Sequence, residues 1–354
     1  MRSIEDREYR YYEYCLAHNK PYFGKVMWAG QGHPIRHAYM QFLVELLCRK
    51  REGKPFKVLE IGSWAGGSAI TWAEGIKKFN QGRGLVICLD PWKIYFDPYR
   101  YSELPDESQI VYREMAEALQ SGGIFDLFLH NIRAAQQEDL IVPMRGSSNE
   151  LLPLFCDEWF DLIFVDGDHT YVSVVEDLMN SARLVAEGGV ICGDDLELQI
   201  SQIDLNYAMA HKQMDYIFDP QARVWYHPGV TLAVGEFSRE VSAWEGFWAM
   251  RKQTGNWEKV ELQTLKPEEI CVPQHLRLPG AGNQNSPGPR LVKEGYRGFN
   301  FVLYGETYYG LAQSLGPVDI TQLSESTRRM WERMGLCRVG SSTDELQSSI
   351  DRLR

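Results

Sequence analysis

The sequence predicts an α/β protein whose parallel sheet carries helices on both faces. Apolar, strand-like segments alternate with segments of helical spacing from about residue 35 to residue 237, and this alternation is typical of parallel sheets. A glycine-rich turn at residues 62–67 follows the first strand-like segment, and aspartates close three of the later ones. Ligands bind open sheets of this kind beyond the carboxyl ends of the strands, so we expect the functional site at that edge.

Hydrophobic periodicity, with glycine and proline breaks, predicts the individual elements. Residues 35–51 repeat apolar side chains at helical spacing, and Gly53-Lys54-Pro55 ends this helix. In chain order, the same reasoning predicts a strand at 58–61, the turn at 62–67, a helix at 68–79, a strand at 85–89, a loop at 91–109, a helix at 124–136, strands at 140–143 and 162–165, a helix at 172–185, a strand at 190–192, a helix before residue 223 and, from its β-branched residues, a strand at 229–237.

The C-terminal part of the chain differs in character from this sheet. Residues 279–289 have the composition of a flexible loop, residues 299–304 and 307–312 predict a β-hairpin, and the end of the chain predicts one or two helices with a frayed terminus. We therefore predict an N-terminal helical arm and gate at residues 1–56, a main domain at residues 57–255 and a small β/α appendage at residues 256–354.

Composition and charge argue against several classes of partner. The formal charge of −11, from 37 basic and 48 acidic residues without a long basic run, disfavours nucleic acids and anionic membranes. The seven cysteines form no C-x-x-C pair, the N-terminus lacks the apolar core of a signal peptide, and no run of about 18 apolar residues occurs. We expect a cytoplasmic protein without a membrane span, acting on a small-molecule or saccharide acceptor. Self-association into a homo-oligomer is compatible with the sequence.

The turn at residues 62–67 predicts a cofactor site. Glycines allow the backbone to approach a ligand closely, and the following helix points its N-terminus at the ligand. The spacing G-x-x-x-G-G at Gly62, Gly66 and Gly67 fits the dinucleotide fingerprint poorly. Asp90 closes the second strand and is placed to hold two ribose hydroxyls, although a loop cap is the alternative. Trp92, just beyond it, is the best aromatic candidate for a cofactor contact.

Three aspartates predict a metal site. Asp166 ends one strand, and Asp194 with Asp195 ends the next, so the three carboxylates converge if these strands are neighbours. Packed together without a cation they would repel one another and raise their pKa values. Oxygen ligands alone favour Mg²⁺ or Mn²⁺ over zinc. The alternative is that Asp166 and Asp194 cap helices and that Asp195 pairs with an arginine.

Three motifs together carry a resemblance to a known family. Val58-Leu-Glu-Ile-Gly-Ser-Trp-Ala-Gly-Gly-Ser68, Val165-Asp-Gly-Asp-His-Thr-Tyr171 and Gly188-Gly-Val-Ile-Cys-Gly-Asp-Asp195 resemble class I S-adenosylmethionine-dependent methyltransferases, and more narrowly the metal-dependent O-methyltransferases of sugars and natural products. The resemblance implies a Rossmann-like sheet and places Glu60 and Gly62 at the methionine side of the cofactor. The full set expected to contact S-adenosylmethionine is Glu60, Gly62, Ser63, Gly66, Ser68, Asp90 at the ribose, Trp92, Ser147 and Ser148 near the adenine, and Asp166.

The expected reaction is direct methyl transfer to a hydroxyl held by the metal. A sugar hydroxyl is a weak acid, so a base should assist, and the candidates are His169 first and Asp168 second. A helix cap or a carboxylate contact is the alternative role of His169. The tail segments 294–304 and 308–316 loosely resemble segments appended to bacterial glycan-assembly proteins, which favours a sugar or glycosylated metabolite as acceptor. The alternatives are a catechol-like or polyketide hydroxyl, or an inactive cofactor-binding accessory protein of glycan assembly.

Overall fold

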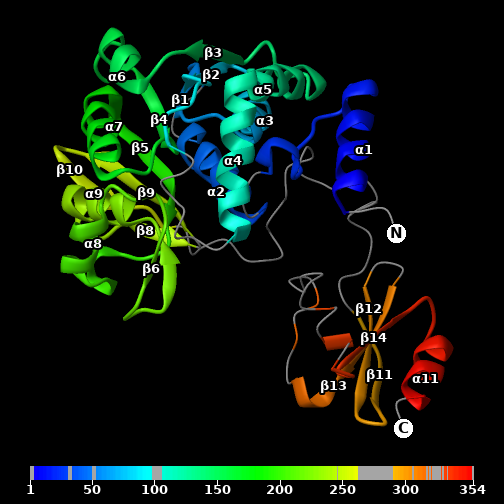
Figure 1. Ribbon diagram of the computed structural model, residues 1–354. Coiled ribbons are helices and arrows are strands. Elements are labelled where there is room, and N and C mark those ends of the chain that lie inside the picture. The colour runs from blue at the N-terminus through cyan, green and yellow to red at the C-terminus, as the bar shows by residue number, and fades with distance from the viewer. Residues whose placement is uncertain are drawn as a thin grey trace. The chain divides into compact units, whose positions relative to one another are not determined.

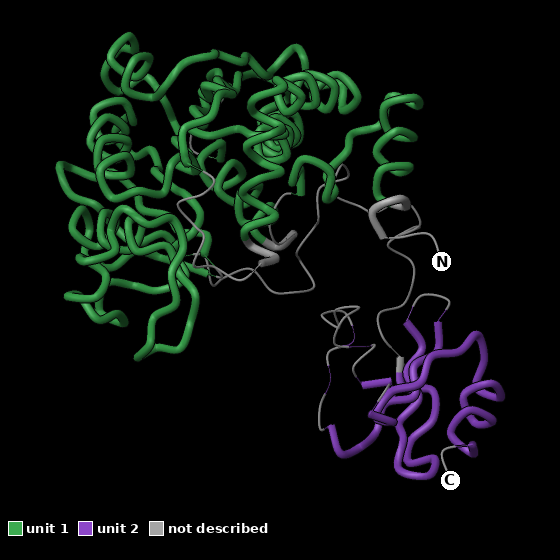
Figure 2. Tube along the Cα trace, in the orientation of Figure 1, with its two compact units in different colours: residues 1–277 green, residues 278–354 purple. Residues whose placement is uncertain are grey.

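The structure is a computed structural model of the chain (Figure 1). It describes residues 4–30, 34–49, 53–97, 106–244, 246–261, 290–304, 307–315, 318, 320, 328, 331–332 and 334–352. The chain forms two compact units, Met1–Arg277 and Leu278–Arg354, which Figure 2 colours separately.

The first unit is built on a sheet of eight strands in the order β10-β9-β5-β4-β1-β2-β3, with β8 paired to β9. Strands β1 to β5 pair in parallel, whereas β9 runs antiparallel to β5. The predicted α/β class with a parallel core is therefore confirmed. The strands are β1 (Phe56–Ile61), β2 (Gly84–Asp90), β3 (Ile141–Arg145), β4 (Phe160–Val165), β5 (Val185–Leu196), β8 (Ser242–Trp244), β9 (Gly246–Gln253) and β10 (Asn256–Lys259).

Helices cover both faces of this sheet, as predicted (Figure 1). The elements outside the sheet are α1 (Ile4–Ala17), η1 (Val26–Trp28), α2 (Pro34–Cys48), α3 (Gly67–Asn80), α4 (Asp106–Ser121), α5 (Gly123–Ala134), α6 (Ser148–Leu151), η2 (Leu152–Leu154), α7 (Tyr171–Leu184), η3 (Ile200–Gln202), α8 (Leu205–His211), the small hairpin β6 (Ile217–Asp219) and β7 (Val224–Tyr226), and α9 (Pro228–Ser238). None of the helices in the described ranges has the length and apolar character needed to cross a bilayer.

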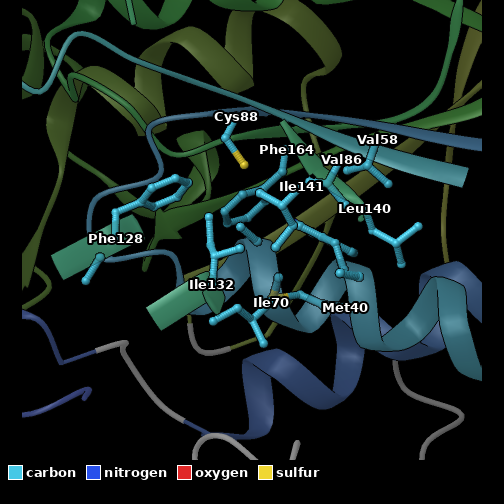
Figure 3. Close-up of a cluster of buried hydrophobic side chains, with 14 of the residues drawn as sticks. Met40, Val58, Ile70, Val86, Cys88, Phe128, Ile132, Leu140, Ile141 and Phe164 are labelled. Atoms are coloured by element: carbon cyan, nitrogen blue, oxygen red, sulfur yellow. The ribbon is translucent and has the colours of Figure 1, made fainter. Parts of the chain in front are cut away.

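Two hydrophobic cores lie on opposite faces of the sheet because neighbouring strand residues point in opposite directions. In β1, Val58 joins the core formed with α2, α3 and α5, whereas Leu59 joins the core formed with α7 and α9. In Figure 3, Met40 of α2, Ile70 of α3 and Phe128 of α5 gather around the first of these cores. The strands are thus buried on both sides, and their carboxyl ends are held at one rigid edge.

The strand predicted at residues 229–237 is wrong, because this segment is helix α9. Pro228 occupies the first turn, where a missing N–H costs nothing, and every residue from Pro228 to Gly235 is buried. A Cβ on Gly229 would lie 2.2 Å from the backbone oxygen of His169, so the helix packs directly against the start of α7. A helix buried all round shows no amphipathic period, which hid it from the sequence.

Other elements also escaped prediction, among them α4 and β9. Helix α4 occupies residues 106–121, partly within the segment predicted as a loop. Strand β9 extends the sheet beyond β5, and its first five residues are buried. The other predicted helices and strands up to residue 192 correspond to α2, α3, α5, α7 and β1 to β5, with ends that shift by several residues at most. The loop predicted at residues 279–289 lies outside the described residues.

The second unit contains a sheet of four strands in the order β11-β12-β13-β14. The predicted hairpin is confirmed, since Phe299 pairs with Ala312 and Tyr304 pairs with Thr307 in antiparallel register. The elements are β11 (Arg290–Tyr296), β12 (Phe299–Tyr304), β13 (Thr307–Ala312), η7 (Gln313–Leu315), β14 (Cys337–Gly340) and α11 (Thr343–Asp351). Phe299 and Phe301 pack against Leu346 of α11, so this unit has a small core of its own.

Candidate functional site

A cavity of about 470 Å³ opens at the carboxyl ends of β1, β2, β4 and β5. This is the edge at which the sequence predicts the site, and the volume suits a ligand of cofactor size. The cavity is lined by Trp28, Gly30, Arg36, Ile61, Gly62, Ser63, Trp64, Ser68, Leu89, Asp90, Pro91, Tyr95, Met115, Ser147, Ser148, Asn149, Asp166, Gly167, Asp168, His169, Ser173, Asp177, Asp194 and Asp195.

The glycine-rich turn forms one wall of this cavity. Gly62 has a φ of +83°, and its N–H donates to the backbone oxygen of Leu89 at 2.8 Å. A Cβ at this position would lie 2.0 Å from the backbone oxygen of Asp166, so only glycine fits where the turn crosses the end of β4. Ser63 and Ser68 line the cavity, whereas Gly66 faces Phe128 in the core. The glycine-rich turn therefore has the predicted position at the cavity, but Gly66 packs against the core and does not face the cavity.

Asp90 lies beneath the turn and organises it. One carboxylate oxygen accepts from the backbone N–H groups of Ser63 and Trp64, each at 3.1 Å, and the other accepts from the N–H of Trp92 at 2.6 Å. Burial raises the pKa of Asp90, and these backbone donors oppose the rise. The loop-capping role is thus present. A carboxylate offers about four lone pairs, so Asp90, which lines the cavity, can still accept from a ligand.

Trp92 does not lie where the sequence predicted it. Its side chain is 1% exposed, packs against Phe125 and Phe128, and donates from Nε1 to the backbone oxygen of Trp64 at 2.9 Å. Trp92 therefore belongs to the core, and Trp64 in the turn lines the cavity in its place. A side chain that follows a strand end turns into the core when apolar side chains from other segments pack against it. The position of Trp92 relative to the strand in the sequence does not show this.

Glu60 is fully buried beneath the turn. Neither of its carboxylate oxygens makes a well-formed hydrogen bond within the described residues. Burial raises the pKa of Glu60 to about 8, and the nearby Ser63 and Ser68 hydroxyls only partly offset this rise. A buried carboxyl without partners is costly to the fold. Its position next to the cavity wall suits a cationic group of a ligand.

The raised pKa of Glu60 predicts a pH dependence of stability. The folded protein holds a proton here that the unfolded chain releases above its usual pKa of 4.5, so stability should fall between that pH and about 8. The expected slope from this group is about 1 kcal/mol per pH unit in the free energy of unfolding. Urea unfolding at several pH values should show a flatter profile for Glu60→Gln. The exposed Glu117→Gln should keep the wild-type slope, and an equal profile for Glu60→Gln would contradict the prediction.

A cluster of carboxylates and histidines adjoins the turn and forms a second wall of the cavity. Ligand atoms of Asp166, His169 and Asp195 all lie within 4.8 Å of one another. His169 Nε2 is 3.0 Å from Asp195 Oδ2, and His169 Nδ1 is 2.6 Å from Asp215 Oδ1. These carboxylates raise the pKa of His169 well above its usual value despite its burial. Burial and the nearby Asp195 raise the pKa of Asp166 to about 6.

Asp194 is set apart from this cluster, although it follows the same strand. Its side chain pairs with Arg36 of α2, and its backbone oxygen accepts from Trp248 Nε1 at 3.0 Å. The structure thus brings Asp166 and Asp195 together with a histidine, and directs Asp194 to an arginine. Arg36 and His169 supply positive charge near these acids, which the sequence argument had assigned to a metal alone.

Several residues of the cluster were not found in the sequence. His227 lies 2.9 Å from Glu197 and 3.7 Å from Asp195, measured from its Nδ1, and these acids raise its pKa. Asp215, which also accepts from the hydroxyl of Tyr112, has a pKa lowered to about 2 by His169. No spacing links residues 112, 215 and 227 to Asp195. In the sequence, the His227-Pro228 pair indicates only where a helix or strand begins, and it does not show that His227 lies near Asp195.

Asp168 and the serines after β3 occupy helix starts. Asp168 accepts from the N–H and hydroxyl of Thr170 at 3.2 and 3.0 Å, and from the Ser173 hydroxyl at 2.8 Å, while still lining the cavity. Ser147 caps α6 through a reciprocal capping box with Glu150. Ser147 and Ser148 both line the cavity, as predicted. Of the predicted gate, Trp28 and Gly30 do so too, while residues 31–33 lie outside the described residues.

The family comparison decides the class of this site. Residues 59–196 match the family model described as a methyltransferase domain. This part of the chain is a methyltransferase domain. The match runs from β1 to the end of β5 and includes the turn, Asp90 and the three aspartates. The predicted membership of the methyltransferases and their Rossmann-like sheet is thus confirmed for the part that builds the cavity. The comparison with curated proteins gives no match.

The search of solved structures finds similar chains of low identity. The O-methyltransferase NovP is 17% identical, with a TM-score of 0.42 over 62% of this chain and 80% of that one. An O-methyltransferase from Bacillus cereus in complex with SAH is 18% identical, with a TM-score of 0.36 over 68% and 87%. CalS11, a TDP-rhamnose 3'-O-methyltransferase, is 13% identical, with a TM-score of 0.36 over 71% and 96%. Values this low do not transfer an activity.

Proposed function

We propose that this methyltransferase moves a methyl group from S-adenosylmethionine to a hydroxyl of a sugar or glycosylated metabolite. The observation that carries the proposal is that one cavity extends from the Gly62 turn and Asp90 to the cluster of Asp166, His169 and Asp195. The first wall has the groups that a cationic, ribose-bearing cofactor needs. The second has the groups that bind and deprotonate a hydroxyl.

The cofactor's parts match the groups along the first wall. The buried carboxyl of Glu60 lies beneath the turn at the methionine end, and an ammonium group bound there would lower its pKa and favour its charged form. Asp90 has lone pairs left for ribose hydroxyls, and Ser63 and Ser68 border the same end. Ser147 and Ser148 are the groups that would contact the adenine base. Gly66 and Trp92 support the turn from behind.

A divalent cation fits part of the second wall. Asp166, Asp195 and His169 would hold it, with Asp194 joining only by exchanging Arg36 for the metal. When bound, such a cation would polarise an acceptor hydroxyl and lower its pKa. A donor set of oxygens with one imidazole accepts Mn²⁺ as readily as Mg²⁺. Activity lost after chelation and restored by Mg²⁺ or Mn²⁺ would support this, whereas unchanged activity would refute it.

His169 and Asp168 are the candidates to take the proton of the acceptor. Both line the cavity beside Asp166. His169 lies between two carboxylates, which favours its protonated form, so it acts as a base only after losing one of these contacts and only when it does not ligate the cation. Asp168 is held by Thr170 and Ser173 and presents a carboxylate without such a change. Comparing kcat of His169→Gln with that of Asp168→Asn distinguishes the two.

Aromatic side chains beside the cavity support a saccharide acceptor. Trp28, Trp64 and Tyr95 line it, and rings of this kind stack on the apolar faces of sugars. Trp28 also borders a second cavity of about 590 Å³, which Tyr9, Tyr12 and three glutamates line. Carboxylates accept from sugar hydroxyls, so this second cavity suits the rest of a larger acceptor. A catechol-like or polyketide acceptor is the alternative.

Calorimetry with S-adenosylmethionine tests the proposal directly. The purified protein, freed of co-purified ligand, should bind the cofactor at micromolar concentration with and without Mg²⁺. Methyl transfer to a panel of sugar acceptors should then be measured. Binding without turnover on any acceptor would favour the accessory-protein alternative, and absence of binding under both conditions would refute the proposed function.

A further inference from the structure

A buried carboxylate on α7 has no role in the site described so far. Asp177 is 3% exposed and lines the cavity, and its Oδ1 has no hydrogen-bond partner within the described residues. Burial raises the pKa of Asp177 to about 7. A buried acceptor without a partner destabilises the fold, whereas an apolar side chain of this size would not. Because Asp177 lines the cavity, a ligand there is the natural partner for Oδ1.

The surroundings of Asp177 define which part of the cavity it serves. Ser148, at the start of α6, lies beside the carboxyl and opposes the rise in its pKa. A Cβ on Gly167 would lie 3.7 Å from Asp177 Oδ2, so the carboxyl faces the loop after β4. Asp177 therefore occupies the corner where the segments that follow β3 and β4 approach each other, while β1 and β2 lie between these two strands in the sheet. Glu60 and Asp90 lie at the ends of the neighbouring strands β1 and β2.

The proposed function then identifies the ligand atom. With the ammonium group near Glu60 and the ribose near Asp90, the corner of Ser148, Gly167 and Asp177 is left for the purine. Adenine carries one exocyclic amine, which donates, and a carboxylate accepts. We propose that Asp177 accepts a hydrogen bond from this amine and so makes the site selective for adenine over purines with a carbonyl at that position. This inference rests on S-adenosylmethionine being the cofactor.

Two product analogues test the inference without requiring turnover. S-adenosylhomocysteine carries the amine, and its hypoxanthine analogue carries a carbonyl oxygen instead. Calorimetry on the full chain should give about a hundredfold preference of the wild type for the adenine compound, because the analogue loses a donor and places two acceptors together. In Asp177→Leu the adenine compound should bind about tenfold more weakly, and the preference should fall to about threefold.

Two further variants separate recognition from structure. Asp177→Asn keeps an acceptor oxygen and should retain most of the preference. Ser181→Ala removes another buried polar group of α7, which has no hydrogen-bond partner among the residues that the structure describes and does not line the cavity, so it should keep the wild-type preference. Thermal unfolding of each variant checks that the fold persists.

Each outcome decides between the two proposals. An equal preference in the wild type and Asp177→Leu overturns the role of Asp177 and leaves the proposed function intact. Equal binding of both compounds by the wild type also overturns the role of Asp177 and leaves the proposed function intact, even if Asp177→Leu fails to fold. A wild type that binds neither compound overturns the proposed function, and the role of Asp177 with it.

Discussion

Replacing Asp195 by asparagine is expected to lower kcat of methyl transfer about a thousandfold while S-adenosylhomocysteine binds within about threefold of wild type. Asp195 lies 3.0 Å from His169 Nε2 and within 4.8 Å of a ligand atom of Asp166. Its charge therefore orients His169, a candidate base, and also contributes to the proposed metal site. The Gly62 turn and Asp90, which we assign to the cofactor, do not contact it in the described geometry. Steady-state kinetics and calorimetry on the same preparation measure both quantities.

The control for Asp195→Asn is a carboxylate outside the cavity. Asp157 pairs with Arg183 at the surface, and its side chain is 69% exposed. Asp157→Asn should keep kcat within about twofold, since exposed ion pairs contribute little. Asp195→Asn activity within tenfold of wild type, in a folded variant, would contradict the assigned role.

Gly62→Ala is expected to destabilise the protein by at least about 3 kcal/mol and to abolish cofactor binding. Its added Cβ would meet the backbone oxygen of Asp166 at 2.0 Å, and a backbone atom cannot move aside as a flexible side chain can. The φ of +83° adds strain for any residue with a side chain. Urea unfolding gives the change in free energy, and calorimetry gives the loss of binding.

Gly188→Ala is the control that measures backbone strain without a steric clash, so the difference between the two variants gives the steric part. Gly188 has a φ of +77°, close to that of Gly62, but a Cβ there meets nothing within 4 Å. It should cost only about 1 kcal/mol from the backbone conformation. Equal losses for the two variants would indicate that strain alone, and not the approach of the turn to the end of β4, requires glycine at position 62.

Helix α9 illustrates why some of the fold could not be predicted. Apolar and β-branched residues at 229–237 are compatible with a buried strand and with a helix buried all round, and the pattern does not separate them. Close packing against the start of α7 through Gly229 selects the helix. In the same way, the first five residues of β9 are all buried and show no alternating pattern, so its pairing with β5 was visible only in three dimensions.

The adjacent pair Asp194 and Asp195 shows the same limit within the site. Both acids lie near the end of β5, but the register with β9 shifts between Gly193 and Leu196 and Asp195 has a φ of +64°, so the two side chains point in different directions. Asp194 meets Arg36 from α2, and Asp195 meets His169 and His227. The sequence could place both at the strand end. It could not tell which of them would face the histidines.

The sequence by itself determined what depends on near neighbours in the chain. The strands β1 to β5, the glycine turn and the aspartates at strand ends follow from local periodicity and from backbone conformations that only glycine adopts freely. Tertiary structure alone decided which distant groups meet, since Arg36, Tyr112, Asp215 and His227 come from four separate segments. Their contacts depend on how helices pack over the sheet edge. Packing is a property of side chains far apart in sequence, and no local pattern encodes it.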